Sequence, residues 1–297
     1  MTRVLWLGWE DAYTPRRMQE AARDLGISLD TLQITDLVFR VTPTGSCVCL
    51  GNTDIVEFYD VLMARTFHPF ISEALTVARL FASAGKPVID ASLVDEGYAV
   101  SKMHDYLLMS LNGLPVPRTY QVYTEQATQL CLNELDYPVV LKGVHGSHGT
   151  HVFMANNREE VYQRLSTYPA GALMIQEYLP ANEDYRIMVI GYRALPVCVS
   201  RSPENGDFRT NVGSSPHASP KQTTDMPGLV DLAEKASRLL RRECAGVDIR
   251  YHDGKPYVLE VNRRPVFENF ESVTGFNVAS TLLRYIVEKV HSHQRAG

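Results

Sequence analysis

The chain has 297 residues, of which 45% are hydrophobic and 21% are charged, and its formal net charge is −5. This composition excludes an intrinsically disordered protein, and the lack of any run of about 18 apolar residues excludes a membrane-spanning helix. The negative charge argues against nucleic acid or an anionic membrane as the main partner. A chain of this length forms about two domains or one large one.

Strand and helix patterns alternate over residues 1–95, which we expect to form an N-terminal domain. Thr14 is the predicted N-cap of a helix with Pro15 in its first position, and Gly26 ends it. This alternation is typical of a small parallel sheet covered by helices. The glycine-rich dinucleotide-binding fingerprint does not follow the first strand. Strands are predicted at residues 4–7, 27–32, 61–64 and 88–89, and a second helix at residues 72–84.

The five cysteines are odd in number and lack the spacing of a disulfide framework. Cys47 and Cys49 have no further Cys or His near them in sequence, which favours alternating positions of a strand over a metal site. The N-terminus lacks the long apolar segment and the cleavage site of a signal peptide, so we expect a cytoplasmic protein.

Residues 96–178 are expected to form a central subdomain. Ser101 and Thr124 are predicted N-caps of helices that extend to residues 111 and 135. Asn157, followed three residues later by Glu160, predicts the start of another helix. Strands are predicted at residues 137–142, 152–153 and 174–178.

Residues 179–297 are expected to form a C-terminal subdomain made mainly of strands. Residues 213–220 are rich in Gly, Ser and Pro and predict a loop, which either faces a substrate or only connects two elements. Helices are predicted at residues 228–242 and 277–290. Strands are predicted at residues 186–190, 195–199 and 208–212, and as a hairpin at residues 247–251 and 257–261.

Lys142 ends an apolar strand, where a solvated lysine would gain nothing. Glycines follow it, including Gly146 and Gly149, with Ser147 between them, and such a loop brings backbone N–H groups close to an anion. We therefore predict a phosphate site here, although a glycine turn beside a snorkelling lysine is the alternative. The loop is not a Walker A motif, because no Gly-Lys-Ser/Thr follows the glycines.

Two pairs of polar residues lie two positions apart on predicted strands and therefore share a face: Asp184 with Arg186, and Arg209 with Asn211. Two arginines and an amide that face one cleft would suit phosphate oxygens or a developing acyl phosphate. Each pair taken alone is more often a solvated strand face. Residues 176–179 lie where a strand ends and could bind the edge of an adenine.

An Asp-Gly turn joins the strands of the predicted hairpin, which carries Asp248, Glu260 and Asn262. A two-residue turn would pair Asp248 with Leu259 and place Glu260 on the opposite face. A three-residue turn would pair Asp248 with Val258 and place all three polar side chains on one face. We expect the second arrangement, in which the three polar side chains share one face.

Two carboxylates and an amide oxygen on one face form a hard-oxygen site, which favours Mg²⁺ completed by phosphate and water. The alternative is that Glu260 only pairs with Arg263 or Arg264. Because a buried acid needs a counter-charge, we predict a metal at Asp248, Glu260 and Asn262.

Taken together, these segments resemble the ATP-grasp superfamily and, within it, the RimK-like carboxylate–amine ligases. The resemblance covers nearly the whole chain in order. It implies an α/β (α+β) ATP-grasp fold, with an N-terminal Rossmann-like parallel-sheet domain followed by two α+β subdomains that clamp ATP. The matching segments are SKMHDYLL…GLPVPRTY, YPVVLKGVHGSHGTHV, QEYL…EDYRIMVIG, DFRTNV and GVDIRYHDGKPYVLEVN.

The resemblance implies ATP-dependent amide formation, in which a carboxylate attacks the γ-phosphate and an amine then displaces phosphate from the acyl phosphate. The implied nucleotide contacts are Lys102, Lys142, Gly146, Ser147, Gln176, Glu177, Tyr178, Leu179, Asp184, Arg209 and Asn211. The implied catalytic residues, which stabilise charge on the transferred phosphoryl group, are Arg186, Arg209 and Asn211. The implied ligands of two Mg²⁺ ions, which Mn²⁺ could replace, are Asp248, Glu260 and Asn262.

Two segments depart from the family pattern. Thr150 and His151 stand where the glycine loop usually has a basic residue and a glycine, and Arg263 and Arg264 stand where relatives commonly have small residues. Adjacent side chains of an extended segment point in opposite directions, so we predict that one of these arginines grips an acidic group of a substrate. The other is expected to be solvated or paired with a surface acid. Two surface arginines are the alternative.

The implied partners are a small-molecule or peptide carboxylate and an amine, without a membrane or nucleic acid, and we expect a homo-oligomer. Two alternatives to the ligase stay open at this point. One is another ATP-grasp phosphoryl-transfer or carboxylase-like enzyme, and the other is a non-catalytic nucleotide-binding protein.

Overall fold

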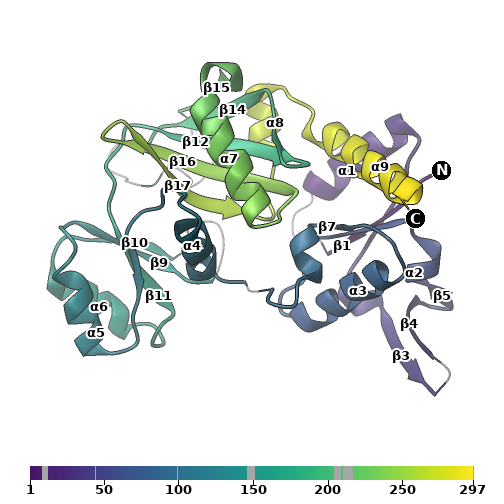
Figure 1. The fold of residues 1–297 in the computed structure, drawn as a ribbon, viewed down its shortest axis with the longest axis horizontal. Coiled ribbons are helices and arrows are strands. Elements are labelled where there is room, and N and C mark those ends of the chain that lie inside the picture. The colour runs from purple at the N-terminus through teal and green to yellow at the C-terminus, as the bar shows by residue number, and fades with distance from the viewer. Residues whose placement is uncertain are drawn as a thin grey trace.

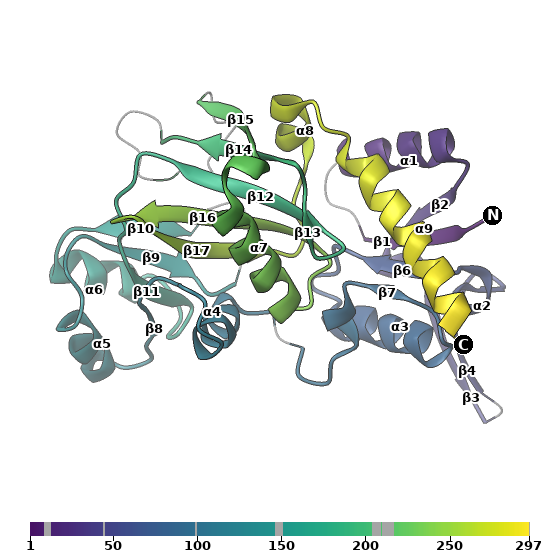
Figure 2. The same ribbon diagram turned by 45° about the horizontal axis from the view of Figure 1, so that its top comes forward.

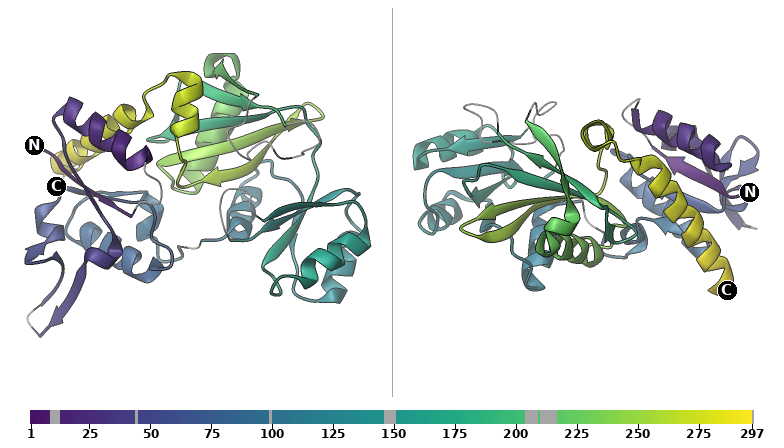
Figure 3. Two further views of the ribbon diagram at one scale, coloured as in Figure 1. Left: turned by 180° about the vertical axis from the view of Figure 1, so that it is seen from behind. Right: turned by 90° about the horizontal axis from the view of Figure 1, so that it is seen from above.

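A computed structural model describes residues 1–8, 13–43, 45–98, 100–145, 151–203, 209 and 217–296. Figure 1 shows a mixed α/β protein with an N-terminal domain at one end and a central subdomain at the other. Seen from behind in Figure 3, the C-terminal sheet lies between these two parts. No helix in the described ranges is long and apolar enough to cross a membrane.

The N-terminal domain contains the predicted parallel sheet, in the order β2-β1-β6-β7. One face of the sheet packs against α3, and the other packs against α1 and the C-terminal helix α9. The prediction of Thr14 as an N-cap is wrong, because α1 begins before it and places Thr14 and Pro15 in the first turn. The elements are β1 (Arg3–Leu7), α1 (Tyr13–Leu25), β2 (Ser28–Leu32), β6 (Val61–Ala64), α3 (Ile71–Ser83), β7 (Val88–Ile89) and α9 (Val278–Ala296).

A three-stranded antiparallel sheet, in the order β3-β4-β5, is inserted between β2 and β6 and extends away from the domain (Figure 1). Cys47 and Cys49 occupy alternate positions of β4, as the sequence predicts, and their sulfur atoms lie 3.5 Å apart. The elements are β3 (Val38–Thr42), β4 (Gly45–Leu50), β5 (Thr53–Asp54) and α2 (Ile55–Phe58).

The central subdomain is an antiparallel sheet, in the order β10-β9-β11-β8, with helices packed against it. The three predicted N-caps, Ser101, Thr124 and Asn157, are confirmed, since each side chain accepts a backbone N–H from three residues later. The predicted helix at residues 124–135 is shorter than expected. The elements are α4 (Lys102–Leu111), β8 (Thr119–Gln121), α5 (Glu125–Leu132), β9 (Val139–Gly143), β10 (Val152–Ala155), α6 (Arg158–Ser166) and β11 (Leu173–Glu177).

The C-terminal subdomain is a six-stranded antiparallel sheet, in the order β15-β14-β12-β16-β17 with β13 paired to β12, and α7 packs on it. Residues 218–220, predicted as part of a loop, belong to β15, while the predicted strand at residues 208–212 lies outside the described residues except for Arg209. Helix α8 was not predicted. The elements are β12 (Asp184–Ile190), β13 (Arg193–Ala194), β14 (Val197–Arg201), β15 (Ala218–Gln222), α7 (Pro227–Leu239), β16 (Cys244–His252), β17 (Lys255–Asn262) and α8 (Glu268–Thr274).

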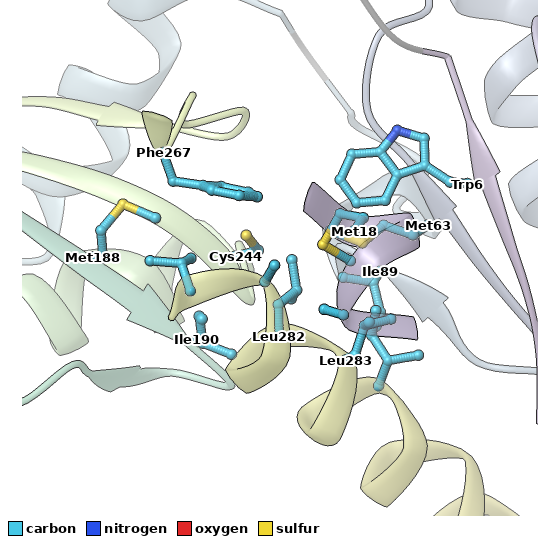
Figure 4. Packing of buried hydrophobic residues seen from close by; sticks show 14 of the residues in the cluster. Trp6, Met18, Met63, Ile89, Met188, Ile190, Cys244, Phe267, Leu282 and Leu283 are labelled. Atoms are coloured by element: carbon cyan, nitrogen blue, oxygen red, sulfur yellow. The ribbon is translucent and has the colours of Figure 1, made fainter. Parts of the chain in front are cut away.

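The C-terminal helix α9 returns to the N-terminal domain and lies beside α1 (Figure 2). One hydrophobic cluster therefore includes side chains from the N-terminal sheet, from α9 and from the C-terminal sheet. Figure 4 shows Trp6 and Met63 on one side of this junction, Met188 and Phe267 on the other, and Leu282 of α9 between them. The predicted domain boundaries stay predictions, but this shared core fixes the first and last parts of the chain against each other.

Candidate active site

A pocket of about 830 Å³ lies between the central sheet and the C-terminal sheet. Its walls come from α4, β9 and β11 on one side and from β12, β14, β16 and β17 on the other. Most residues that the sequence predicts for nucleotide and metal line the pocket: Lys102, Lys142, Gln176, Glu177, Tyr178, Leu179, Asp184, Arg209, Asp248 and Glu260. The predicted site residues Gly146, Ser147 and Asn211 lie outside the described residues.

The β16–β17 hairpin places its two carboxylates on one face, but by a route that neither predicted register contained. The turn has two residues, with His252 paired to Lys255, so the expectation of a three-residue turn is wrong. A β-bulge at Leu259 then shifts the register, and Asp248 lies directly opposite Glu260. The hydroxyl of Tyr106 on α4 donates a hydrogen bond to the carbonyl oxygen of Leu259, which ties the bulge to the central subdomain.

Three arginines surround the two aspartates of the C-terminal sheet. The Arg186 guanidinium donates to Asp248 Oδ1 at 2.5 Å and to Oδ2 at 2.7 Å, and Arg201 Nη2 donates to Oδ1 at 2.7 Å. Arg250 binds Asp184 in the same bidentate way, at 2.5 and 2.9 Å. We call these five residues the Asp–Arg layer. Its net charge of +1, from three cations and two anions, favours a bound anion.

The sequence interpretation missed Arg201 and Arg250. A signal for Arg250 was present, because Asp248-Ile249-Arg250 repeats the pattern of Asp184-Tyr185-Arg186 on a neighbouring antiparallel strand. The register pairs Asp184 with Arg250 and Arg186 with Asp248, so each acid meets a base. The local sequence contained no comparable signal for Arg201, which follows the apolar run of β14.

The ionisation of Asp248 is decided by two opposing effects. Burial by itself raises the pKa of this carboxyl, but the charges of Arg186 and Arg201 lower it below its usual value. Asp248 is therefore an anion at neutral pH. Arg201 is also buried, which lowers the pKa of its guanidinium, and its Nε has no hydrogen-bond partner among the described residues.

The hairpin fits a divalent cation. Asp248 Oδ1 accepts two hydrogen bonds and is saturated, whereas Oδ2 accepts one short bond from Arg186 and a long one, 3.4 Å, from the Asn262 amide. If the nitrogen and oxygen of the Asn262 side-chain amide exchange places, the oxygen lies beside Asp248 Oδ2. The Glu260 carboxylate lies on the facing strand, directly opposite Asp248. Three hard oxygen ligands are then available, which is a partial shell that Mg²⁺ completes with phosphate and water.

Two lysines face Glu260 from the central subdomain. Lys102 is the first residue of α4, and its Nζ lies 3.5 Å from Glu260 Oε1. Lys142 lies on β9 and is partly buried in the pocket wall. Burial lowers the pKa of Lys142 to about 8, against the attraction of Glu260. A phosphate beside this ammonium would offset the cost of its desolvation.

The predicted adenine segment is held in place by side-chain contacts. Gln176 is buried, and its amide donates to Thr119 Oγ1 at 2.7 Å. The Glu177 carboxylate accepts from the backbone N–H of Arg118 at 2.8 Å and from its Nε at 2.7 Å. The Leu179 carbonyl accepts from Arg250 at 2.7 Å, which connects this strand exit to the Asp–Arg layer.

Arg263 and Arg264 both contact the chain at or just after the end of β6, and the expectation that one of them grips an acidic group of a substrate stays a prediction. Arg263 donates to the backbone oxygens of Ala64 and Arg65, at 3.3 and 2.8 Å, and burial lowers its pKa to about 10. Arg264 donates to Thr66 Oγ1. The reason is the shared core, which brings the N-terminal sheet against the segment that follows β17.

Comparison with known proteins agrees with this geometry. A family model described as a RimK-like ATP-grasp domain matches residues 99–286. A ribosomal protein bS6–L-glutamate ligase of Escherichia coli O81 (strain ED1a) is 26% identical over 283 residues, which cover 92% of this chain and 91% of that protein.

Solved structures show the same fold. The ATP-grasp ligase PsnB, complexed with minimal precursor, Mg and ADP, matches with a TM-score of 0.74 and 17% identity over 97% of this chain and 98% of that chain. The D-alanine–D-alanine ligase from Bacillus anthracis matches with a TM-score of 0.65 and 16% identity over 100% of both chains. The resemblance found in the sequence and the predicted fold class are confirmed, and the carboxylase-like and non-catalytic alternatives are not favoured. The chain belongs to the RimK-like ATP-grasp family and is an ATP-dependent carboxylate–amine ligase.

Proposed function

We propose that this ligase uses ATP and Mg²⁺ to join an amino acid to a carboxylate of a peptide or protein. The names of the relatives support this choice: one is a glutamate ligase for a ribosomal protein, and PsnB is complexed with a precursor, Mg and ADP. The observation that carries the proposal is the pocket itself, where Asp248, Glu260 and two lysines face one another at the edge of the Asp–Arg layer.

The residues of the pocket divide between binding and charge stabilisation. We propose that the adenine lies against residues 176–179 and that Lys102 and Lys142 hold phosphate oxygens. Asp248, Glu260 and Asn262 would hold Mg²⁺, with two ions as the proposed number and Mn²⁺ as a replacement. The bound cation neutralises phosphate charge and orients the transferred group.

Arginines that line the pocket, together with Arg186 behind Asp248, would stabilise the transferred phosphoryl group. Arg186 keeps Asp248 ionised and has guanidinium donors left for phosphoryl oxygens, and Arg201 Nε is an unused buried donor. Arg209 lines the same pocket, and the predicted partner Asn211 lies outside the described residues. Positive groups that are already in position stabilise the negative charge that develops on the phosphoryl group in the transition state.

The proposed reaction has two steps. A carboxylate oxygen bonds to the γ-phosphorus as the bond to ADP breaks, and the amine nitrogen then bonds to the acyl carbon as the bond to phosphate breaks. The amine must be neutral to attack, and its proton leaves to solvent or to phosphate. The cytoplasmic location and the homo-oligomer expected from the sequence stay predictions.

The test is a product assay. The purified chain with ATP and Mg²⁺ is given a set of peptides with free carboxyl termini, together with each of the common L-amino acids. We expect ADP release that requires both substrates and Mg²⁺, and a peptide whose mass increases by one amino-acid residue. A phosphorylated or carboxylated product without an amide, or ADP release that no amino acid stimulates, would refute the proposal.

A further inference from the structure

A second cavity lies at the junction between the N-terminal sheet and the segment that follows β17. It opens to solvent, and its empty space, the part open to solvent included, is about 340 Å³. Trp6, Phe267 and Leu282 form its apolar walls and can be followed in Figure 4. Its polar side chains are Thr14, Arg65, Thr66 and Arg264, and none of the described lining residues is acidic.

Arg65 is the unusual member of this cavity. It is only 3% exposed, yet its Nη1 has no hydrogen-bond partner among the described residues. Its nearest acid is Asp90, with Oδ2 at 3.6 Å from Nη1, and its Nη2 makes only a long contact of 3.7 Å with the sulfur of Cys244. A buried guanidinium with an unused donor costs free energy unless something else binds it. Arg264, on the same cavity, adds a second guanidinium.

The cavity adjoins the metal-binding end of the active site. Arg264 follows Asn262 by two residues, so the chain passes directly from the metal hairpin to the cavity wall. The two sites also meet at Gly246 of β16. A Cβ atom there would lie 3.0 Å from Pro265, which lines the cavity, and 3.2 Å from Arg186, which binds Asp248.

Hydrogen bonds and a close backbone approach hold the cavity wall that carries Arg65. Arg263 binds two backbone oxygens of residues 64–65, and Arg264 binds Thr66. Gly8, at the end of β1, has φ +80°, and a Cβ atom on it would lie 1.6 Å from the carbonyl oxygen of Thr66. Only glycine allows this approach, which holds the backbone next to Arg65 close to the end of β1.

We propose that Arg65 and Arg264 bind the α-carboxylate of the amino acid that supplies the amine. The inference rests on the proposed function and names the residues that select this substrate. Guanidinium groups recognise carboxylates through paired, charge-assisted hydrogen bonds, and the apolar walls exclude water from them. A carboxylate held in this way is neutralised and kept from the phosphoryl group, so it belongs to the amine donor rather than to the activated acid.

The test compares each active amino acid with its α-carboxamide, which keeps the amine and the side chain but removes the negative charge. With the wild-type enzyme, we expect kcat/KM to be about tenfold to a hundredfold lower for the amide, as for the loss of a charged hydrogen bond. In Arg264→Gln and Arg65→Gln, KM for the acid should rise until acid and amide are used almost equally, while KM for ATP stays constant. Arg241→Gln is the matched control, because it removes an arginine contact with Asp95 away from the cavity, and it should keep the wild-type preference.

The comparison separates a binding role from a structural one. A structural defect lowers kcat/KM for acid and amide by the same factor, and that result would overturn the proposal. If Arg65→Gln does not fold, Arg264→Gln and the amide measured on the wild-type enzyme still decide the question. Amide formation with no preference for the acid would refute this inference alone, whereas no amide product with any amino acid would refute the proposed function.

Discussion

We expect Lys142→Met to stabilise the nucleotide-free protein and to weaken its binding of nucleotide. The substitution keeps the length and apolar stem of the side chain but removes its charge. Burial lowers the pKa of Lys142 from 10.5 to about 8, which means that the folded protein holds this charge at a cost. Removing the charge removes that cost, together with the contact that we propose for the phosphate.

The magnitude follows from the pKa. A difference of about 2.5 pH units corresponds to about 3 kcal/mol, and because the side chain keeps some solvent contact we expect about 1–3 kcal/mol. The pH dependence of the stability difference follows from the protonation of Lys142. Below pH 8 the lysine is charged in both the folded and the unfolded state, so the full cost applies. Between pH 8 and 10.5 the folded state releases its proton first, and the wild type becomes more stable with rising pH until the two proteins converge.

Thermal unfolding at pH 7, 8.5 and 10, without nucleotide, measures the first effect. The melting temperature of Lys142→Met should exceed that of the wild type by several degrees at pH 7 and by little at pH 10. Calorimetric titration with ADP and Mg²⁺ measures the second effect, and Kd should rise about tenfold or more. Lys255→Met, at the exposed hairpin turn, is the control and should change neither quantity. The reasoning is wrong if Lys142→Met is no more stable than the wild type at pH 7 and binds ADP equally well.

Three further substitutions test the site. Glu260→Gln should fold normally, and its rate of ADP release in excess Mg²⁺ should fall by roughly a hundredfold or more, as expected for a lost metal ligand. A rate near that of the wild type would show that Glu260 is not a metal ligand. Asp248→Asn should lower the free energy of unfolding by about 3–5 kcal/mol in urea denaturation, because the buried Arg201 and the half-buried Arg186 lose their counter-charge; an unchanged midpoint would contradict the Asp–Arg layer. Gly8→Ala should lower the melting temperature and raise KM for the amine donor, since its Cβ would overlap Thr66, whereas Gly26→Ala, at φ +65° in open space, measures the backbone strain alone.

Local signals in the sequence predicted most of the elements and one face of the site. The N-caps at Ser101, Thr124 and Asn157 depend on neighbours three residues away, so the sequence contains all the information they need. The shared face of Asp248 and Glu260 was predicted from a three-residue turn, although that turn and its register are wrong. A bulge changes the hydrogen bonding of one residue, and no residue type at Leu259 requires it.

Contacts between distant segments explain what was missed. Arg201 meets Asp248 across β12, and Arg65 reaches its cavity only because α9 closes the N-terminal sheet onto the C-terminal one. Neither position has a motif, since each arginine simply ends an apolar strand. The pattern is nevertheless shared with Lys142, because all three are cations within one residue of the end of a buried strand. A buried strand that ends in a cation is therefore a useful sign of an anion site when several strands end near one another.

Strand β17 and the residues that follow it connect the two cavities. Glu260 of β17 lines the nucleotide pocket, and the chain reaches the second cavity at Arg264, two residues after the end of β17 at Asn262. If nucleotide and amine donor occupy these cavities, the activated carbonyl must lie between them, beside Asn262 and Arg186. Positioning of this kind replaces a bimolecular encounter with a reaction between neighbours, which can supply several kcal/mol of the barrier reduction. The shared core of the first and last parts of the chain matters for the same reason. A small shift between them would move Arg65, and with it the bound amine donor, away from the activated carbonyl, and the rate would fall although no reacting group has changed.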